Sequence, residues 1–226
     1  MTEVAEELLA AVRGAHADVT PTKDGFDVSA QHLAGDALAA ALEQVARLPG
    51  HVDLDLTDGS IRDDDLPLLA KLPNRRRLDL SRNNITEDGL VHLGRLTQIT
   101  DLWLDEIYVD KELRHLAKLD GLELLGLRDT AVTGETLKHF TRLRKLDHLF
   151  LDESPIDDSA LEVLREMKWL RTLSLTRTRI TDDGLRHLRD LTELTELFLG
   201  DNRVTDDGLE HLGKLASIVS LELIVR

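Results

Sequence analysis

The chain has 226 residues, with 43 acidic side chains against 28 Lys and Arg, and a formal net charge of −15. Such an acidic surface repels nucleic acid and anionic membranes, so neither is expected as a partner, whereas a protein or peptide, including a basic one, is favoured. The absence of cysteine excludes disulfide bonds and thiolate metal sites, and with only 3% aromatic residues the core must be filled by leucine.

The N-terminal segment predicts a short amphipathic helix over residues 2–13, which Gly14 can end. Its apolar residues at helical spacing are Val4, Leu8, Leu9 and Val12. The acids here do not fit a signal peptide, and no stretch reaches the roughly 20 apolar residues of a membrane span. We therefore expect a cytoplasmic protein in which residues 1–24 form a helical cap over an array of repeats in residues 25–226.

The repeated unit is clearest in residues 170–193 and 194–217. These segments read LRTLSLTRTRITDDGLRHLRDLTE and LTELFLGDNRVTDDGLEHLGKLAS. Each has an L-x-x-L-x-L opening, a polar turn, an Ile or Val, and then Thr-Asp-Asp-Gly-Leu. A fixed period of this length indicates a solenoid, in which each coil buries its leucines only by stacking on its neighbours.

Strands are predicted around pairs of apolar residues, which from Leu54/Leu56 on recur every 24 residues, except for one 23-residue step from Leu104 to Leu127. The pairs are Phe26/Val28, Leu54/Leu56, Leu78/Leu80, Leu102/Leu104, Leu125/Leu127, Leu149/Leu151, Leu173/Leu175, Leu197/Leu199 and Leu221/Leu223. Helices are expected between them, at 36–48, 64–72, 88–96, 111–119, 135–143, 159–167, 183–191 and 207–215. This alternation predicts nine parallel strands.

Within a coil, the two leucines of L-x-L point inward and the residue between them points outward, because strand side chains alternate. The threonines before the acidic pairs are expected to cap the helices. They are Thr86, Thr133, Thr181 and Thr205. The polar residue in the turn after each strand is expected to form hydrogen bonds along the stack. In the 23-residue coil Ile107 occupies this turn position, and it is expected to fill the core instead.

This pattern resembles the leucine-rich repeat. The I-T-D-D-G-L form is similar to repeats of bacterial leucine-rich repeat proteins and of eukaryotic F-box leucine-rich repeat proteins, although no F-box is apparent in the first 24 residues. The resemblance covers Phe26–Arg226. It implies an α/β fold, a right-handed solenoid with a parallel sheet of about nine strands on its concave side, helices on its convex side, and a partner bound on the concave face.

The outward column in the middle of the concave sheet predicts the binding surface. It is expected to start with three acids, Asp27, Asp55 and Asp79, and to continue with three rings, Trp103, Phe150 and Phe198. Small residues separate the rings and leave slots between them, and Tyr108 is placed at the rim. Like charges on neighbouring strands are destabilising, whereas rings beside acids suit a cationic, partly apolar protein. The alternative is that the rings only pack over the inner curve of the arc.

Other functions are weaker interpretations. The recurring histidines fall one per coil on different helices and lack the H-x-x-x-H spacing, so no metal or other cofactor is expected. Asp55 and Asp79 could act as a carboxylate pair of a hydrolase, but a smooth sheet offers no deep pocket, so we do not expect an enzyme. The second hypothesis is a structural unit that forms a homodimer through the edge strand Leu221–Val225.

Overall fold

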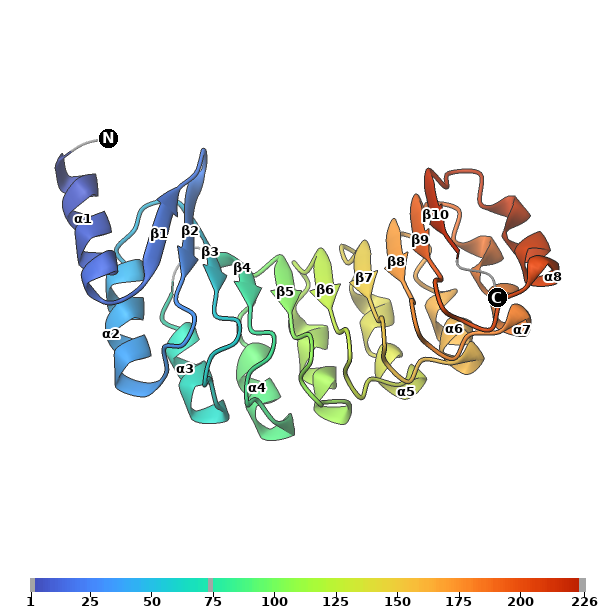
Figure 1. Ribbon diagram of the computed structural model, residues 1–226, viewed down its shortest axis with the longest axis horizontal. Helices are drawn as coiled ribbons and strands as arrows, with labels where there is room; N and C mark the ends of the chain where they lie inside the picture. The colour runs from blue at the N-terminus through green and yellow to red at the C-terminus, as the bar shows by residue number, and fades with distance from the viewer. Residues whose placement is uncertain (1–2, 73–74, 224–226) are drawn as a thin grey trace.

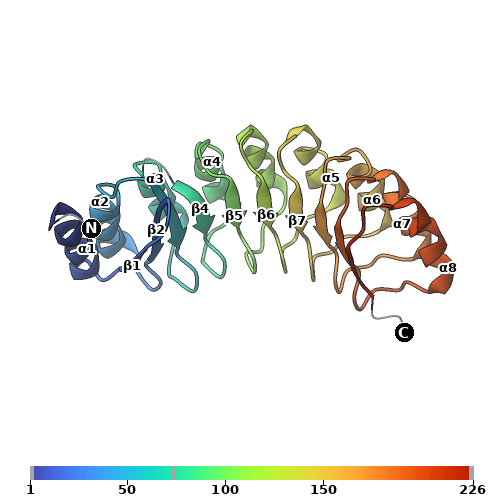
Figure 2. The same cartoon turned by 90° about the horizontal axis from the view of Figure 1, so that it is seen from above.

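The computed structural model describes residues 3–72 and 75–223 and has the shape of a shallow arc. In these residues ten strands form one sheet whose order follows the chain, from β1 to β10 (Figure 1). Helical segments follow the strands and lie along the outer side of the arc (Figure 2). The predicted α/β solenoid, with strands on the concave side and helices on the convex side, is confirmed.

The elements are short and regularly spaced. The strands are β1 (Asp18–Pro21), β2 (Gly25–Ser29), β3 (His51–Asp55), β4 (Arg75–Asp79), β5 (Asp101–Trp103), β6 (Leu124–Gly126), β7 (His148–Phe150), β8 (Thr172–Ser174), β9 (Glu196–Phe198) and β10 (Ser220–Glu222). The α-helices are α1 (Glu3–Gly14), α2 (Gly35–Val45), α3 (Leu66–Leu69), α4 (Leu90–Leu93), α5 (Gly134–Leu137), α6 (Asp158–Leu164), α7 (Asp182–Leu185) and α8 (Asp206–Leu209). The 3-10 helices are η1 (Asp63–Asp65), η2 (Glu87–Gly89), η3 (Lys111–Lys118), η4 (Phe140–Arg142), η5 (Leu188–Asp190) and η6 (Glu210–Lys214).

The leucine pairs set the register of the sheet. Leu102 pairs with Leu125, and Leu125 pairs with Leu149, in parallel ladders that continue from coil to coil. Leu125 and Leu127 are both completely buried, so the two positions share the inner face as predicted. The Ile107 side chain is also buried in the core, which confirms its expected role in the 23-residue coil.

The first coil differs from the prediction in two ways. β1 is an additional strand, antiparallel to β2, in a segment where no strand was predicted. Val28, rather than Phe26, lies opposite Leu54. The second inward residue of this coil is Ala30, which is buried but too small to reveal the repeat in the sequence. The division into a cap of residues 1–24 and an array of residues 25–226 stays a prediction.

The convex segments lie where helices were predicted, but they are shorter. Most combine one α-helical turn with a 3-10 turn, because the next strand must start after only a few residues. In the 23-residue coil the whole segment, η3, is a 3-10 helix. η3 lies close to the preceding coil, since a Cβ added at Gly94 would lie 2.5 Å from the His115 carbonyl oxygen.

Most of the threonines that were expected to cap helices donate instead to an aspartate of the preceding coil. We call this series of hydrogen bonds between coils the acidic ladder. Thr86 caps its own helix by accepting a hydrogen bond from the Asp88 N–H. Thr181 and Thr205 do not accept such a bond, and neither does Thr133. The prediction was wrong at these three positions, where the threonine hydroxyl instead donates to a carboxylate of the preceding coil.

Asp158 and Asp182 show the geometry of this ladder. The N–H and the hydroxyl of Thr205 donate to Asp182, at 2.8 and 2.7 Å, and those of Thr181 donate to Asp158 in the same way, at 2.9 and 2.6 Å. A Cβ at Gly208 would lie 2.2 Å from an Asp182 oxygen. The glycine of each T-D-D-G motif therefore makes room for the carboxylate of the preceding coil.

The ladder is interrupted between α5 and α6. Gly134 occupies the position of the ladder acid, and Asp157 occupies the position of the threonine. Asp157 instead caps its own helix, accepting hydrogen bonds from the N–H groups of Ser159 and Ala160. No ladder bond therefore joins these two coils on the convex side in the described structure.

The ladder predicts a difference between two equivalent aspartates. Asp182→Ala should lower the free energy of unfolding by about 1 kcal/mol, the usual cost of a lost cap. Asp206→Ala should cost less, because among the described residues no hydrogen bond reaches the Asp206 carboxylate. Urea unfolding of the two variants measures both values, and equal losses would contradict the ladder.

The Asp182 contribution should also depend on pH. The donors on Thr205 hold the pKa of Asp182 below its usual value. A lowered pKa in the folded state gives stability that is present above the unfolded pKa and is lost as pH falls through the folded pKa. The difference between wild type and Asp182→Ala should therefore shrink in acid, below about pH 4.

The polar turn residues form the expected hydrogen bonds along the stack. Asn83 donates to the carbonyls of Leu56 and Leu80, which belong to successive coils, at 2.8 Å each. Asn202 does the same with Leu175 and Leu199, at 2.6 and 3.2 Å. These buried amides satisfy backbone groups that would otherwise be unpaired at the turns.

Candidate functional site

Two of the predicted rings stack on the concave face. The ring centroids of Trp103 and Phe150 are 5.2 Å apart, with 28° between the planes. The indole lies over Gly126, where an added Cβ would come within 2.2 Å of it. The expected slot at Gly126 is therefore filled by the indole, and that part of the prediction was wrong.

An arginine lies over each stacked ring. The Arg77 guanidinium carbon is 5.7 Å from the centroid of the Trp103 ring, and that of Arg128 is 5.1 Å from the centroid of the Phe150 ring. The Arg128 Nε also lies 3.0 Å from an oxygen of Asp152. The cluster runs from arginine to arginine through two rings, an arrangement stabilised by cation–π attraction.

A groove of about 650 Å³ continues from Phe150 past Ser174 to Phe198. We call it the acidic groove, because seven acids and two arginines line it. The acids are Asp79, Asp105, Glu106, Asp129, Asp152, Glu153 and Glu222, and the arginines are Arg82 and Arg128. The excess of negative charge favours a cationic occupant.

Asp105 is held in an unfavourable environment in this groove. Burial raises the pKa of its carboxyl above the usual value, and the charges of Asp79 and Asp152 raise it further. Arg128 opposes this rise, since its backbone N–H donates to Asp105 at 3.0 Å and its guanidinium is positively charged. Asp105 and Asp152 were not among the predicted site residues. Their position just after a strand, with the side chain expected to point outward, was the signal that they line the site.

The three acids predicted for the middle column are not equivalent. Asp27 lies opposite Asp53, so it belongs to the adjacent column, and the predicted direct opposition of Asp27 and Asp55 was wrong. The Asp55 carboxylate accepts hydrogen bonds from Gln31 and Thr57, which give it a structural role. Asp79 alone of the three lines the acidic groove.

A second hollow on the concave face lies toward the N-terminus. It measures about 310 Å³ and is lined by Asp27, Asp53, Asp55 and Asp79, with Arg77 among them. Asp79 borders both hollows, so negative charge continues along the face from one hollow to the other. Asp27 and Asp55 are thus placed beside the acidic groove rather than within it.

Tyr108 lies at the turn edge of the sheet. Its side chain is 86% exposed and borders a separate hollow of about 380 Å³, together with Pro155, Arg177 and Arg179. It does not line the acidic groove. The structure therefore brings Phe150 and Phe198 into one groove with Trp103 stacked at its end, and leaves Tyr108 outside.

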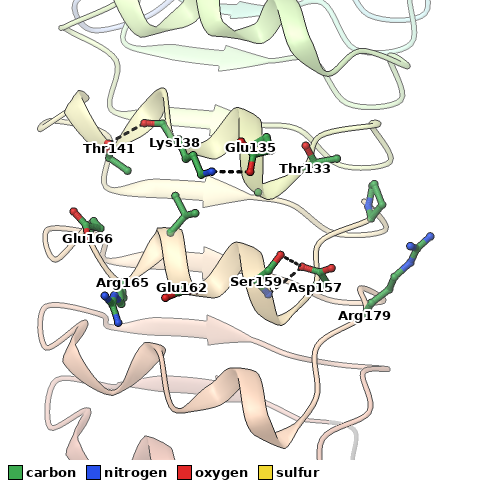
Figure 3. A pocket seen from close by; sticks show the side chains of 13 residues that line it. Thr133, Glu135, Lys138, Thr141, Asp157, Ser159, Glu162, Arg165, Glu166 and Arg179 are labelled. Carbon is green, nitrogen blue, oxygen red and sulfur yellow. Dashed lines mark hydrogen bonds and ion pairs between the residues drawn. The ribbon is translucent and has the colours of Figure 1, made fainter.

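A further hollow of about 740 Å³ lies on the convex side, where the acidic ladder is interrupted (Figure 3). Lys138 pairs there with Glu135 at 2.6 Å. Asp157 is bonded to Ser159 on the neighbouring helix (Figure 3). These groups are exposed and of mixed charge, and none of the predicted site residues lies here.

Two further findings concern the residues that the structure describes. No group of three or more His, Cys, Asp or Glu side chains is placed so that it could hold a metal ion. No described helix has the length and apolar character needed to cross a membrane.

Comparisons with known proteins agree with this architecture. A family model described as "Leucine Rich repeat" matches residues 76–94, 166–188 and 190–213. A search of the curated proteins gives no match. The similarity of the I-T-D-D-G-L form to F-box protein repeats stays an interpretation.

Among solved structures, the fold is similar to two internalins of Listeria monocytogenes str. 4b F2365. Internalin C2 (inlC2) has 24% identity and a TM-score of 0.67, with 88% of this chain and 80% of that chain covered. An internalin (inlF) has 20% identity and a TM-score of 0.65, with 87% of this chain covered, and the chain spans 59% of its length. With the repeat matches and the coil-by-coil register of the sheet, these similarities show that the chain has a leucine-rich repeat fold.

Proposed function

We propose that this protein is a protein-interaction module that binds a basic protein or peptide on its concave face. Trp103, Phe150 and Phe198 supply apolar anchors, and the acids of the groove attract the partner. The observation that carries this proposal is the pair of stacked rings beside a groove lined by seven acids and two arginines. Aromatic side chains near the centre of a contact surface typically supply most of the binding energy.

The position of the rings supports binding over simple packing. The partly exposed rings lie on the concave face of the sheet, which points away from the core; they are Trp103, Phe150 and Phe198. The leucines of the same strands point the other way and fill the core. Trp169 differs, because it packs against the core cluster from outside the sheet. Truncating a concave ring should therefore remove a contact surface without opening a core cavity.

The charge distribution supports a basic partner. The pKa of Asp105 is raised by burial and by nearby carboxylates, so a positive charge placed in the groove would offset an existing repulsion. The net charge of −15 would also steer a basic partner toward the protein, with a rate that falls as salt rises. Absence of a nucleic-acid partner and a cytoplasmic location stay predictions.

Phe150→Ala is expected to weaken binding at least about tenfold while leaving the melting temperature nearly unchanged. The probes are random dodecapeptides displayed on phage and selected on the wild-type protein, and then synthesised for fluorescence-polarisation titrations. The selected peptides should be basic, and Trp103→Ala should weaken their binding in the same way. Weaker binding in high salt is also expected, because the groove contributes charge attraction.

Tyr108→Ala is the matched control for these variants. It also removes an exposed ring, but from outside the acidic groove, so we expect binding within about twofold of wild type. Two results would contradict the proposal. Wild-type binding by Phe150→Ala and Trp103→Ala would show that the groove is not used, and a large fall in their melting temperatures would show that the rings are packing residues.

A structural unit that self-associates is the second candidate, and the C-terminal side of the sheet favours it. β10 pairs with β9 alone among the described strands, and Val219 and Leu221 there are 86% and 42% exposed. Part of the predicted dimer segment Leu221–Val225 lies outside the described residues. This candidate requires a dimer mass in light scattering that falls to the monomer mass in Leu221→Lys.

A further inference from the structure

Phe150 and Phe198 flank a position occupied by a single small residue. They belong to the same outward column, and Ser174 lies between them on the intervening strand. Two strand spacings separate their backbones by about 10 Å. A planar group in contact with a ring on each side needs about 7–8 Å between the rings, twice a normal contact distance. The column therefore has room for one planar group above Ser174.

The neighbouring position in the same column shows how such a space can be closed. Between Trp103 and Phe150 the indole leans over Gly126 and stacks on the phenyl ring. Between Phe150 and Phe198 no such ring contact is made among the described residues, and Ser174 is buried at the floor with its hydroxyl bonded to Asp152. Both Phe residues and Ser174 line the acidic groove, so the space between the two rings borders this groove.

The protein already contains an example of the interaction that a side chain bound in this space could make. The Arg128 guanidinium lies over Phe150 and forms an ion pair with Asp152. Both Trp103 and Arg128 reach Phe150 from preceding coils, and the coil that follows contributes Ser174 to this column. A second guanidinium could therefore approach from the side of β8. It would meet ring surface and the negative charge of Asp152 and Glu153.

We propose that the space between Phe150 and Phe198 binds one arginine side chain of the partner, with its guanidinium between the rings above Ser174. This inference rests on the proposed function and names the side chain that the acidic groove recognises. Arginine suits the space better than lysine, because its flat guanidinium can stack on rings while it keeps its charge. Lysine offers only a compact ammonium group.

The first test changes the peptides. Dodecapeptides selected on the wild-type protein should share an arginine, and replacing it by lysine should weaken binding about tenfold. Replacement by citrulline, which keeps the shape but removes the charge, should weaken binding at least as much. Equal binding of the arginine and lysine peptides, within about twofold, would overturn the inference.

The second test changes the protein. Ser174→Leu fills the space between the rings. It should weaken binding of the arginine peptide at least about tenfold, and the arginine peptide should then bind no better than the lysine peptide. Ser29→Leu is the matched control, because Ser29 lies in the same column six strands before Ser174, and it should bind as wild type. Should Ser174→Leu not fold, Phe198→Ala removes one wall of the space and should abolish the same preference.

The results separate this inference from the proposed function. If Phe150→Ala and Trp103→Ala lose binding while Ser174→Leu and Phe198→Ala keep it, the concave face binds basic segments but the arginine position is wrong. If no selected peptide depends on the groove, both are wrong. Loss of the arginine preference in Ser174→Leu and Phe198→Ala, with Ser29→Leu unchanged, supports both.

Discussion

Leu175→Ala is expected to lower the free energy of unfolding by about 2–5 kcal/mol, the range found for truncating buried leucines. Leu175 is completely buried, directly after β8, and its N–H is bonded to the Phe198 carbonyl of the next coil. The substitution removes apolar contacts and leaves a cavity between coils that are fixed on both sides. Urea unfolding followed by circular dichroism gives the value.

Asp206→Ala serves as the control for this measurement. Its side chain is exposed at the start of α8, so it aids only a helix start and should cost much less than Leu175→Ala. Similar losses in the two variants would contradict the repeat interpretation, because it assigns one residue to the core and the other to the surface.

Gly94→Ala is expected to cost about 1–3 kcal/mol, the usual penalty for forcing an extra carbon into a packed region. A Cβ at Gly94 would lie 2.5 Å from the His115 carbonyl oxygen, which is backbone and cannot rotate away. The two coils would have to separate where η3 approaches α4. Thermal unfolding of the variant should show a lower midpoint.

Gly213→Ala tests whether this cost comes from the close approach. Gly213 follows His-Leu as Gly94 does, but an added Cβ there meets nothing within 4 Å. Alanine favours helical backbone over glycine, so this variant should be neutral or up to about 1 kcal/mol more stable. A destabilised Gly213→Ala would show that glycine matters for the repeat itself rather than for contact with η3.

Most of the fold could be predicted because each coil repeats the same physical problem. The L-x-L pairs bury one face of every strand, and a one-residue shift would expose that face, so the period itself sets the register. The 23-residue coil was also predictable, since Ile107 replaces a polar residue and a buried position explains it. The first coil was not predictable, because Val28 and Ala30 lack the leucine signature. In addition, β1 pairs with the edge of β2, where the repeat pattern predicts no strand.

The acidic ladder was hidden for a different reason. A threonine before acids is a good helix cap in isolation, and sequence reasoning about a single coil stops there. In the stack, Thr205 meets the carboxylate of Asp182 from the preceding coil. Bonds between coils depend on how closely they pack, which local propensity does not contain.

The site was predicted in outline but not in its details. The alternation of strand side chains placed Trp103, Phe150 and Phe198 on the outward face. The tilt of the indole over Gly126 depends on a side-chain rotamer that no periodicity specifies. The acids that line the groove, such as Asp105, come from the ends of strands and the turns after them, and an outward position alone does not specify which of them share one hollow.

The interruption at Gly134 and Asp157 should make the joint between these two coils less stiff than the rest of the arc. Backbone ladders and the Thr130–Ser154 contact still tie the two coils together on the strand and turn sides. On the convex side the carboxylate tie is missing, and the hollow of Figure 3 lies there. Bending should therefore concentrate at this joint, with the outer gap widening as the inner curve tightens. Since Phe150 lies in the coil at the joint, a partner that closes the arc would draw the groove around itself at little elastic cost.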